Sequence, residues 1–596
     1  MLHTDLQLAP ARVDVERRAD GTLVLRSPMP LGPCARCAGE WLVAWARRTP
    51  ERVFLAERNT QGGWRLVSYG EALDAVVRIG ASLLARGLGP ERPIAILSDN
   101  GVDHALVMLG AMHVGVPVAP VSPAYSLLSK DFAKLRGIFE LVEPGLVFVD
   151  DGAGMKGASP FAPALEAVGA RATPLSALLD DAGEPARRRV DAAFAAVGPD
   201  TVAKILFTSG STGAPKGVTN TQRMLCASQE GLAAGWPFLE SRPPVVVDWL
   251  PWSHTFGGNH NFNLVLRNGG TLYVDGGKPA PGLIERTVRN LTEVSPTAYF
   301  NVPRGFDLLL PHLETDAALR ASFFRELDVV FYAAAALPPN LWARLEALAH
   351  AERGGRLAMF SAWGATETSP LATQVHFAID RAGVIGLPIA GCELKLVPSA
   401  GKLEARVRGP NVTPGYVKRP DLTRAAFDEE GFYRTGDAMK LADPDRPERG
   451  VVFDGRVAED FKLTTGTWVH VGALRTRLIA AADPFVQDAV ITGHDRDEVG
   501  ALLFLTAQAR AQPPATVAAR LAEALAALAE DPGGSSMRVG RALVLDEPAS
   551  LDDGEITDKG YLNQRAILER RALRVADLYR GGDRVIVVRG ARNGVR

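Results

Sequence analysis

Residues 208–218 run Thr-Ser-Gly-Ser-Thr-Gly-Ala-Pro-Lys-Gly-Val, directly after 204–207, a short and mostly apolar run that predicts a buried strand. Glycines and hydroxyl residues dominate the stretch, so its backbone N–H groups can converge on phosphate oxygens, and Lys216 adds a positive charge for the same anion. It is not a Walker A loop, because Lys216 follows a proline and precedes a glycine. A flexible linker is the alternative, but linkers do not normally interrupt a buried strand with this mixture. The sequence therefore predicts a phosphate-binding loop.

The alternation of strand and helix continues along much of the chain. Apolar runs predict strands at 93–98, 114–121, 145–149, 204–208, 244–248, 270–274 and 328–332. Apolar residues at three- and four-residue spacing predict helices at 69–88 and 102–113. Strands that alternate with helices predict an α/β fold with largely parallel sheets.

The pattern changes after about residue 455. Short apolar runs at 488–492, 501–505 and 542–545 surround one amphipathic helix, 517–528. Its expected buried face consists of Val517, Leu521, Leu525 and Leu528. We therefore expect an N-terminal arm at 1–35, a large multi-subdomain domain at 36–454, a hinge at 455–460 and a small α+β domain at 461–596.

Composition excludes several classes of protein. The 596 residues carry 66 Lys+Arg against 68 Asp+Glu, a net charge of −2, which disfavours a nucleic-acid binder. Four cysteines exclude a disulfide framework, and the Cys34–Cys37 pair lacks the neighbours of a zinc or redox site, so we expect chance spacing. The N-terminus has no signal-peptide pattern and no 18-residue apolar stretch occurs. The sequence predicts a cytoplasmic protein without membrane insertion.

Five further motifs follow residues 208–218 in a fixed order. They are LPWSHTFG (250–257), WGATET (363–368), YRTGD (433–437), Gly455-Arg456 and GEITDKG (554–560). Together with TSGSTGAPKG they resemble the signature of the acyl-adenylate-forming superfamily, which includes acyl-CoA synthetases, nonribosomal adenylation domains and luciferases. The resemblance spans about residues 40–570. It implies a large ATP- and acid-binding adenylation domain and a small, mobile C-terminal lid.

The resemblance also implies two half-reactions at one site. A carboxylate attacks the α-phosphate of Mg·ATP to give an acyl-adenylate and pyrophosphate, and the thiol of coenzyme A then displaces AMP. Glu367 and the Thr212 hydroxyl would hold Mg²⁺, and Lys559 would stabilise charge on the α-phosphate and the carboxylate. The nucleotide-binding residues implied are Thr208, Ser209, Gly210, Ser211, Thr212, Gly213, Lys216, Ala334, Ala335, Trp363, Gly364, Ala365, Thr366, Asp437 and Arg456. Within this set Thr366 would bond the α-phosphate, and Asp437 the ribose hydroxyls.

The chain departs from the common motifs in ways that resemble one branch. Trp363 replaces a tyrosine, four alanines at 333–336 replace a glycine-rich segment, Ala458 replaces a charged hinge residue, and a glycine follows Lys559. These features, with AEDFKLTTGTWV and GEITDKGYLNQRA, resemble bacterial feruloyl-CoA synthetases. The expected acid-binding residues are His254, Phe256, Asn259, Asn261, Phe300, Val302, Tyr332, Ala333 and Trp363. Those expected at the hinge and coenzyme A are Ala458, Lys462, Gly466 and Trp468.

The leading hypothesis is an AMP-forming ligase that makes CoA thioesters of ferulate, caffeate or 4-coumarate, in aromatic acid catabolism. His254 would position the acid and gate its site, with a structural role as the alternative. Other open alternatives are a different aromatic acid, a medium- or long-chain fatty acid, and a catalytically silent nucleotide-binding protein. A carrier-protein loading module and a luciferase-type oxidase have less support. The expected partners are the aromatic acid, ATP and coenzyme A, and a homodimer is left open.

Overall fold

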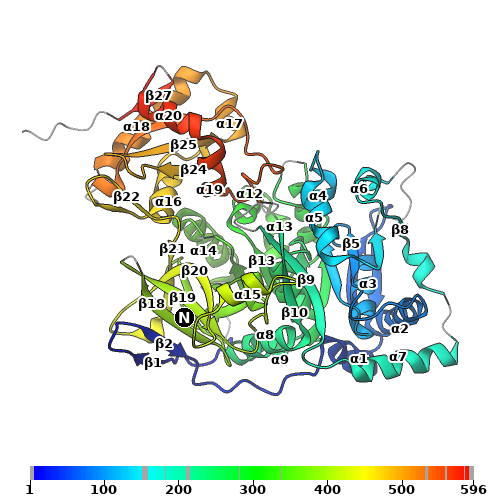
Figure 1. Cartoon of the computed structure of the whole chain (residues 1–596). Coiled ribbons are helices and arrows are strands. Elements are labelled where there is room, and N and C mark those ends of the chain that lie inside the picture. Colours follow the sequence, from blue (N-terminus) through cyan, green and yellow to red (C-terminus); the bar gives the residue numbers. More distant parts are fainter. Residues whose placement is uncertain are drawn as a thin grey trace, which may run out of the picture. The chain divides into compact units, whose positions relative to one another are not determined.

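The computed structural model describes residues 6–150, 159–180, 183–209, 215–280, 282–335, 337–399, 401–530, 535–557, 560–582 and 584–588. The chain divides into two compact units (Figure 1). Unit 1 comprises 1–397, 405–435 and 441–452, and unit 2 comprises 398–404, 436–440 and 453–596. The α/β prediction, with a large N-terminal and a small C-terminal domain, is confirmed. No helix in the described part of the chain is long and apolar enough to cross a membrane.

A six-stranded sheet carries the predicted phosphate loop. Its order is β10 (Pro215–Thr221), β9 (Val202–Ser209), β6 (Val118–Val121), β5 (Ile94–Leu97), β7 (Leu146–Val149) and β8 (Ala172–Thr173). All neighbours are parallel except β10 and β9. The strand predicted at 114–121 begins only at Val118, because the chain turns at Gly115, whose φ is +76°.

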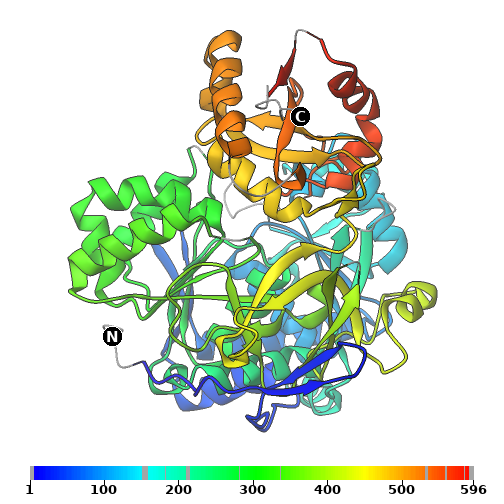
Figure 2. The ribbon, with the colours of Figure 1, turned by 90° about the vertical axis from the view of Figure 1, so that its left-hand side faces the viewer.

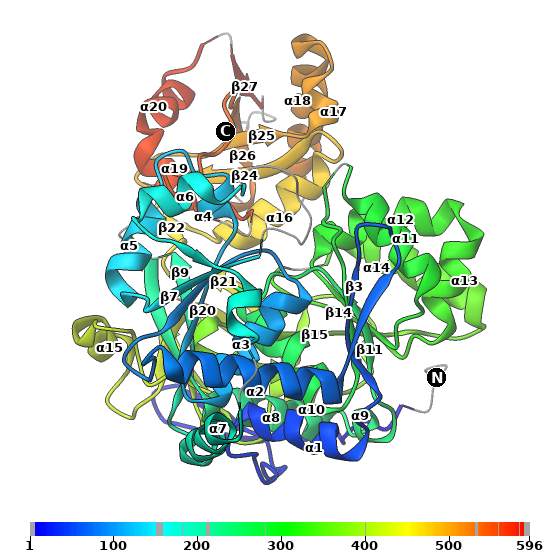
Figure 3. The same ribbon diagram turned by 90° about the vertical axis from the view of Figure 1, so that its right-hand side faces the viewer.

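Four helices gather beside one another in the same unit (Figure 3). They are α1 (Ala38–Arg48), α2 (Tyr69–Ala85), α3 (Val102–His113) and α7 (Glu184–Ala196). Both predicted helices are present, and α2 ends three residues before its predicted end. α2 and α3 pack closely because Gly110 faces Ile79, where an added Cβ would lie 2.6 Å from Ile79 Cγ2. Ser68 caps α2 by accepting a hydrogen bond from the Glu71 backbone N–H.

Two further sheets contain strands of the larger unit, and the second of them also includes residues of unit 2. A four-stranded sheet has the order β11 (Val245–Asp248), β12 (Thr271–Val274), β3 (Val53–Arg58) and β4 (Trp64–Ser68). An eleven-stranded sheet has the order β1 (Asp14–Arg17), β2 (Leu23–Arg26), β18 (Glu393–Ser399), β19 (Lys402–Arg408), β20 (Tyr433–Leu441), β21 (Val451–Arg456), β17 (Val384–Pro388), β16 (Leu371–Gln374), β15 (Ala358–Gly364), β14 (Val329–Tyr332) and β13 (Ala298–Asn301). Within the segment expected to be an arm, β1 and β2 form a hairpin that joins the sheet through Leu25 opposite Leu394 (Figure 2).

Strands β13 and β14 separate two groups of side chains. Tyr299 and Tyr332 belong to a core with helices α11 (Ile284–Glu293), α12 (Pro303–Thr315), α13 (Ala317–Arg325) and α14 (Pro339–Arg353). Phe300 and Phe331 alternate with them along the strands and therefore point to the opposite face. Two helices used below are α8 (Gln222–Gly235) and α10 (Phe262–Arg267). The shorter helices are α4 (Ala124–Leu127), α5 (Ala133–Val142), α6 (Ala162–Ala167), α9 (Phe238–Ser241), α15 (Pro420–Ala426) and α17 (Ala507–Arg510).

Unit 2 has a core of its own. Its sheet has the order β24 (Val486–Thr492), β25 (Val499–Leu505), β26 (Val539–Val544) and β27 (Val585–Val587). Its helices are α16 (Val471–Ala481), α18 (Pro514–Glu530), α19 (Gln564–Arg570) and α20 (Ala572–Arg580). The helix predicted at 517–528 is α18, and all four predicted apolar positions are buried. The segment after the predicted hinge forms a small hairpin, β22 (Phe461–Lys462) with β23 (Trp468–Val469).

Candidate active site

The predicted phosphate loop begins and ends on strands. β9 continues through Thr208 to Ser209, and β10 starts at Pro215, so the hairpin places Lys216 directly opposite Thr208. Residues directly opposite in an antiparallel pair share one face of the sheet, so the side chains of Lys216 and Thr208 lie on the same face of the hairpin. Gly210, Ser211, Thr212 and Gly213 lie outside the described residues.

Glu367 is buried, and hydrogen bonds hold both its carboxylate and its backbone carbonyl. It lies on a short 3-10 turn, Thr366–Thr368, that follows β15, and 8% of its surface is exposed. The Tyr416 hydroxyl donates to Glu367 Oε1 at 2.9 Å, and the Thr413 backbone N–H donates to the Glu367 carbonyl at 2.8 Å. Glu367 forms no ion pair within the described part of the chain. A buried carboxylate normally pairs with a cation or binds a metal, so this residue fits the expected Mg²⁺ ligand.

Tyr416 connects the carboxylate with the phosphate-loop lysine. Lys216 Nζ lies 5.3 Å from the centroid of the Tyr416 ring. The backbone N–H of Val417, which follows Tyr416, donates to the Gly217 carbonyl at 2.9 Å. Burial, and then the negative charge of Glu367, raise the pKa of the Tyr416 and Tyr433 hydroxyls above the ordinary value. Both phenols therefore stay protonated near neutral pH. Tyr416 lies outside the quoted motifs and was not predicted as a site residue.

The WGATET segment depends on a close backbone approach. A Cβ added at Gly364 would collide with the Pro370 carbonyl, so only glycine fits at that position. Trp363, on β15, is buried, and Thr366 is buried beside Glu367. The Ala365 N–H donates to the Thr368 hydroxyl at 2.8 Å, which closes the turn.

One of the alanines after β14, Ala334, occupies a backbone conformation that favours glycine. Ala334 has a φ of +73° and is exposed, together with Ala335, while Ala333 is half-buried. A left-handed conformation costs an alanine about 1–2 kcal/mol relative to glycine. The replacement of glycine by alanine at this turn therefore carries a local conformational cost.

Asp437 and Arg456 lie together in unit 2. Asp437 is on β20, Arg456 ends β21, and Arg456 Nε lies 3.5 Å from Asp437 Oδ1. The Arg456 side chain is 66% exposed and also lies 3.9 Å from a Glu459 oxygen. The structure thus brings together two of the residues expected at the nucleotide. Lys559 lies outside the described residues.

The hinge region contains a buried ion pair that was not anticipated. Lys402 Nζ pairs with Asp460, and both side chains are 5% exposed. Asp460 also accepts from His470 Nδ1 at 2.9 Å and from the Val471 N–H, the first residue of α16, at 3.0 Å. Ala458 lies in the turn after β21. The ion pair fixes the segment after the turn to β19, and the two hydrogen bonds fix it to the start of α16, all within unit 2.

The hairpin after the hinge places two expected coenzyme A residues in contact. Lys462 on β22 is directly opposite Trp468 on β23, and its Nζ lies 4.9 Å from a Trp468 ring centroid. Gly466, with a φ of +79°, turns the chain between the two strands.

The expected acid-binding segment forms a π-helix, Phe256–Asn261, between His254 and α10. Two glycines make the π-helix possible, because a Cβ at Gly257 or Gly258 would collide with the carbonyls of residues 250–252. The wider π turn displaces backbone carbonyls from the regular ladder. Side chains of neighbouring elements bond them: Lys204 donates to Gly258 O at 2.8 Å, and Gln229 donates to the carbonyls of residues 259 and 260.

The expected acid-binding residues do not all lie together. Phe256 and Phe300 each pack on the Phe331 ring, and these three residues form the ring cluster. His254 is buried at the start of the π-helix. The amide nitrogens of Asn259 and Asn261 are engaged inside the protein, with Asn220 at 2.9 Å and Asp248 at 3.0 Å.

Tyr332 and Val302 lie apart from that ring cluster. The Tyr332 ring packs in the core on the other face of β14, and its hydroxyl accepts from the Gly383 N–H at 3.4 Å. Val302 precedes α12 as its N-cap residue.

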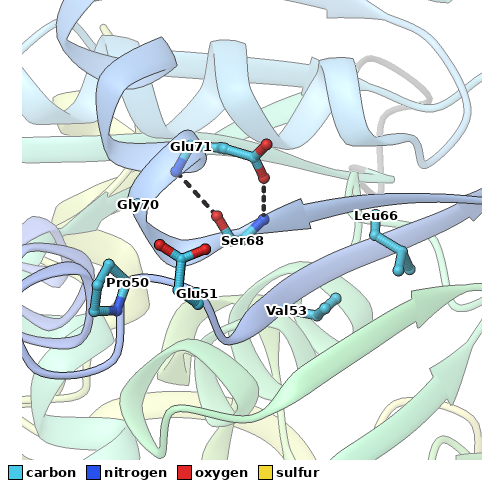
Figure 4. A pocket seen from close by; sticks show the side chains of 7 residues that line it. All are labelled: Pro50, Glu51, Val53, Leu66, Ser68, Gly70 and Glu71. Atoms are coloured by element: carbon cyan, nitrogen blue, oxygen red, sulfur yellow. Dashed lines mark hydrogen bonds between the residues drawn. The ribbon is translucent and has the colours of Figure 1, made fainter.

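A separate surface hollow is lined by Pro50, Glu51, Val53, Leu66, Ser68, Gly70 and Glu71 (Figure 4). The Glu71 carboxylate accepts from the Ser68 N–H at 2.8 Å, and the Ser68 hydroxyl accepts from the Glu71 N–H at 3.2 Å. The side chains of Ser68 and Glu71 in this hollow are thus engaged in the α2 cap. In the described part of the chain, no cluster of three or more His, Cys, Asp or Glu residues could hold a metal ion.

Comparisons with known proteins agree with this architecture. The profile of the family described as AMP-binding enzyme matches residues 42–417, and that of the AMP-binding enzyme C-terminal domain matches residues 462–583. The chain belongs to the AMP-binding enzyme family, within the acyl-adenylate-forming superfamily.

The chain is 28% identical over 461 residues to the sulfoacetate–CoA ligase of Cupriavidus necator, covering 74% of this chain and 84% of that one. It is 28% identical over 325 residues to a carboxylic acid reductase of Mycobacterium tuberculosis, covering 50% and 26%. An O-succinylbenzoate–CoA synthetase of Bacillus subtilis, solved with AMP, shares the fold with a TM-score of 0.66 at 19% identity, covering 88% and 97%. The chain spans only 5% to 33% of the length of the first three curated relatives it matches.

Proposed function

We propose that this protein is an AMP-forming ligase that activates a hydroxycinnamic acid, such as ferulate, caffeate or 4-coumarate, and transfers it to coenzyme A. The observation that carries the ligase chemistry is the buried Glu367 carboxylate, joined through Tyr416 to the strand that bears Lys216. In this arrangement Glu367 would bind the Mg²⁺ and Lys216 would neutralise the triphosphate of Mg·ATP. Two CoA ligases among the relatives, for sulfoacetate and phenylacetate, support the same reaction class.

The first half-reaction is a phosphoryl-type displacement, in which the protein chiefly positions groups and neutralises charge. An oxygen of the acid bonds to the α-phosphorus of ATP, and the bond to pyrophosphate breaks. Lys216 would neutralise charge on the departing phosphates, and Glu367 would hold the Mg²⁺ that enters with ATP. Asp437 would accept hydrogen bonds from the ribose hydroxyls.

The second half-reaction needs a good leaving group. The sulfur of coenzyme A bonds to the acyl carbon, and AMP departs with the electron pair of the acyl–oxygen bond. Lys462 and Trp468 lie on the hairpin that would approach coenzyme A. The ammonium of Lys462 and the ring of Trp468 would offer coenzyme A a positive charge and a flat aromatic surface.

An aromatic substrate is supported by the ring cluster beside the π-helix. The Phe331 ring centroid lies 5.7 Å from that of Phe256 and 5.5 Å from that of Phe300, and such a cluster of apolar rings suits a planar aromatic acid. The competing substrates within the same chemistry are other aromatic acids and medium- or long-chain fatty acids.

A panel of acids tests the proposal. The purified protein would be given ATP, Mg²⁺ and coenzyme A with ferulate, 4-coumarate, benzoate, octanoate or palmitate, and AMP release and thioester formation would be followed. The proposal expects the highest kcat/KM with a hydroxycinnamate. A higher kcat/KM for a fatty acid would overturn the substrate assignment, and binding of ATP without turnover of any acid would indicate a silent nucleotide-binding protein.

A further inference from the structure

A buried histidine beside the π-helix has a ring nitrogen that no described residue uses. His260 is 1% exposed, and its Nε2 has no hydrogen-bond partner in the described part of the chain. Neither half-reaction of the proposed function employs this side chain. An unpaired polar atom inside a protein costs about 1–3 kcal/mol, so a use for Nε2 is expected.

The neighbours of His260 fix which of its nitrogens carries the proton. Asn261 donates its amide nitrogen to Asp248 Oδ2 at 3.0 Å, and therefore turns its amide oxygen toward His260 Nδ1, 2.8 Å away. An amide oxygen only accepts, so Nδ1 must be the N–H donor. Burial lowers the pKa of His260 to about 4, which keeps the ring neutral near pH 7. Nε2 is consequently a lone-pair acceptor.

Three phenylalanine rings pack around the His260 imidazole. The His260 ring centroid lies 5.1 Å from Phe331, 5.4 Å from Phe300 and 5.7 Å from Phe256. Phe256 is half-buried, whereas Phe300 and Phe331 are buried, so Phe256 forms the outer side of the cluster. One acceptor within apolar ring surfaces is complementary to an aromatic ring that carries a single hydroxyl donor.

We propose that His260 Nε2 accepts a hydrogen bond from the phenolic hydroxyl of the acid and so selects 4-hydroxyaryl acids. This inference rests on the proposed function. Because the carboxylate of the acid must stay at the α-phosphate, the group that extends farthest into the ring cluster is the substituent at the 4-position. A 4-hydroxyl satisfies Nε2, whereas an unsubstituted ring, a methyl ether or an alkyl chain has no proton to donate and leaves Nε2 unpaired.

The hydrogen-bonded series His260, Asn261 and Asp248 gives each residue a separate role. His260 would touch the substrate, whereas Asn261 and Asp248 are positioning residues that hold its Nδ1 proton in place. Asn259 donates its amide nitrogen to Asn220, so it stabilises the π-helix that carries His260. Specificity would thus depend on a chain of buried polar contacts that starts at β11.

The experiment compares His260→Phe with wild type and with His376→Phe. His376 is a matched control, because it is also buried with an unpartnered Nε2 among the described residues, and it packs on Phe377 outside the ring cluster. Acid-dependent AMP release would be measured with 4-coumarate, cinnamate, 4-methoxycinnamate and octanoate. The readout is the ratio of kcat/KM for 4-coumarate to kcat/KM for cinnamate. This ratio should be roughly 10–100 in wild type and His376→Phe, and near one in His260→Phe.

An unchanged ratio in folded His260→Phe would overturn the inference. If His260→Phe does not fold, wild type alone decides, since equal kcat/KM for 4-coumarate and 4-methoxycinnamate would also overturn it. Equal turnover of all three aryl acids by wild type would reject the role of His260 and leave the proposed function standing. Turnover of octanoate without any aryl acid would reject both.

Discussion

The hydroxyl of Tyr416 donates a 2.9 Å hydrogen bond to the Glu367 carboxylate, and these residues are 49 positions apart in the chain. The same tyrosine places its ring 5.3 Å from Lys216 Nζ. One side chain therefore sets the orientation of the carboxylate relative to the lysine. A shift of either group would misalign the Mg²⁺ and the triphosphate, which the proposed reaction requires to be held together.

Tyr416→Phe should slow adenylation and raise the KM for Mg·ATP, because the carboxylate loses a buried hydrogen bond worth about 1.5–3 kcal/mol. We expect a combined loss of about 10–100-fold in kcat/KM for Mg·ATP, measured by acid-dependent pyrophosphate release. Tyr299→Phe is the control, since that buried hydroxyl only accepts from an amide, Asn301, at 3.1 Å. Equal kinetic losses in the two variants would contradict a specific role for Tyr416.

Lys559→Ala should separate the two half-reactions. A lysine that stabilises charge only in the adenylation transition state affects that step alone. We expect adenylation to fall by about 10²–10³-fold. Conversion of supplied feruloyl-adenylate and coenzyme A to the thioester should stay near the wild-type rate. A comparable loss in both steps, at unchanged melting temperature, would speak against a role of Lys559 that is confined to adenylation.

Asp460→Ala should destabilise unit 2, because it leaves the buried Lys402 ammonium without its carboxylate. Breaking such a pair costs about 3–5 kcal/mol, whereas replacing both partners by apolar residues is often nearly neutral. The double variant Lys402→Met/Asp460→Leu should therefore be more stable than Asp460→Ala in denaturant unfolding. If the double variant were less stable than the single variant, the ion pair would not be the source of the cost.

His104 should make the stability of the large unit depend on pH. Burial lowers its pKa from 6.5 to about 4, so between these pH values the unfolded chain binds a proton that the folded chain excludes. The contribution of this group is complete above pH 6.5 and is lost as the pH falls toward 4. The destabilisation caused by His104→Gln should thus be about 2 kcal/mol larger at pH 7 than at pH 5. The same destabilisation at both pH values would show that the proton is not excluded.

Local sequence patterns were sufficient to predict elements that are buried on all sides. The helix 102–113 was predicted with its observed bounds, because an apolar segment between a turn and a glycine has few other options. The hairpin β1–β2 was missed, because Asp14–Arg17 is a mostly exposed, charged edge strand without an apolar face. Its pairing depends on Leu394, far away in sequence.

The candidate site divides in the same way. The motifs predict Lys216, Glu367, Asp437 and Arg456 as nucleotide-site residues, because phosphate and ribose binding require particular residue types in short segments, and these roles stay predictions. The contacts of Tyr416 with Glu367, of Lys402 with Asp460, and of His260 with Phe300 and Phe331 join residues that are far apart in the chain. No local spacing reveals them, since each contact forms only when separate strands and helices are brought together. The π-helix likewise follows from Gly257, Gly258 and the side chains that bond its carbonyls.

The measurement that tests the central claim most directly is acid-dependent exchange of labelled pyrophosphate into ATP, without coenzyme A. An AMP-forming ligase makes the acyl-adenylate reversibly, so ferulate or 4-coumarate should support exchange, and addition of coenzyme A should yield one AMP per thioester. Glu367→Gln should abolish the exchange without unfolding the protein. Formation of ADP and phosphate, or the absence of exchange with every acid in a folded protein that binds ATP, would contradict the account.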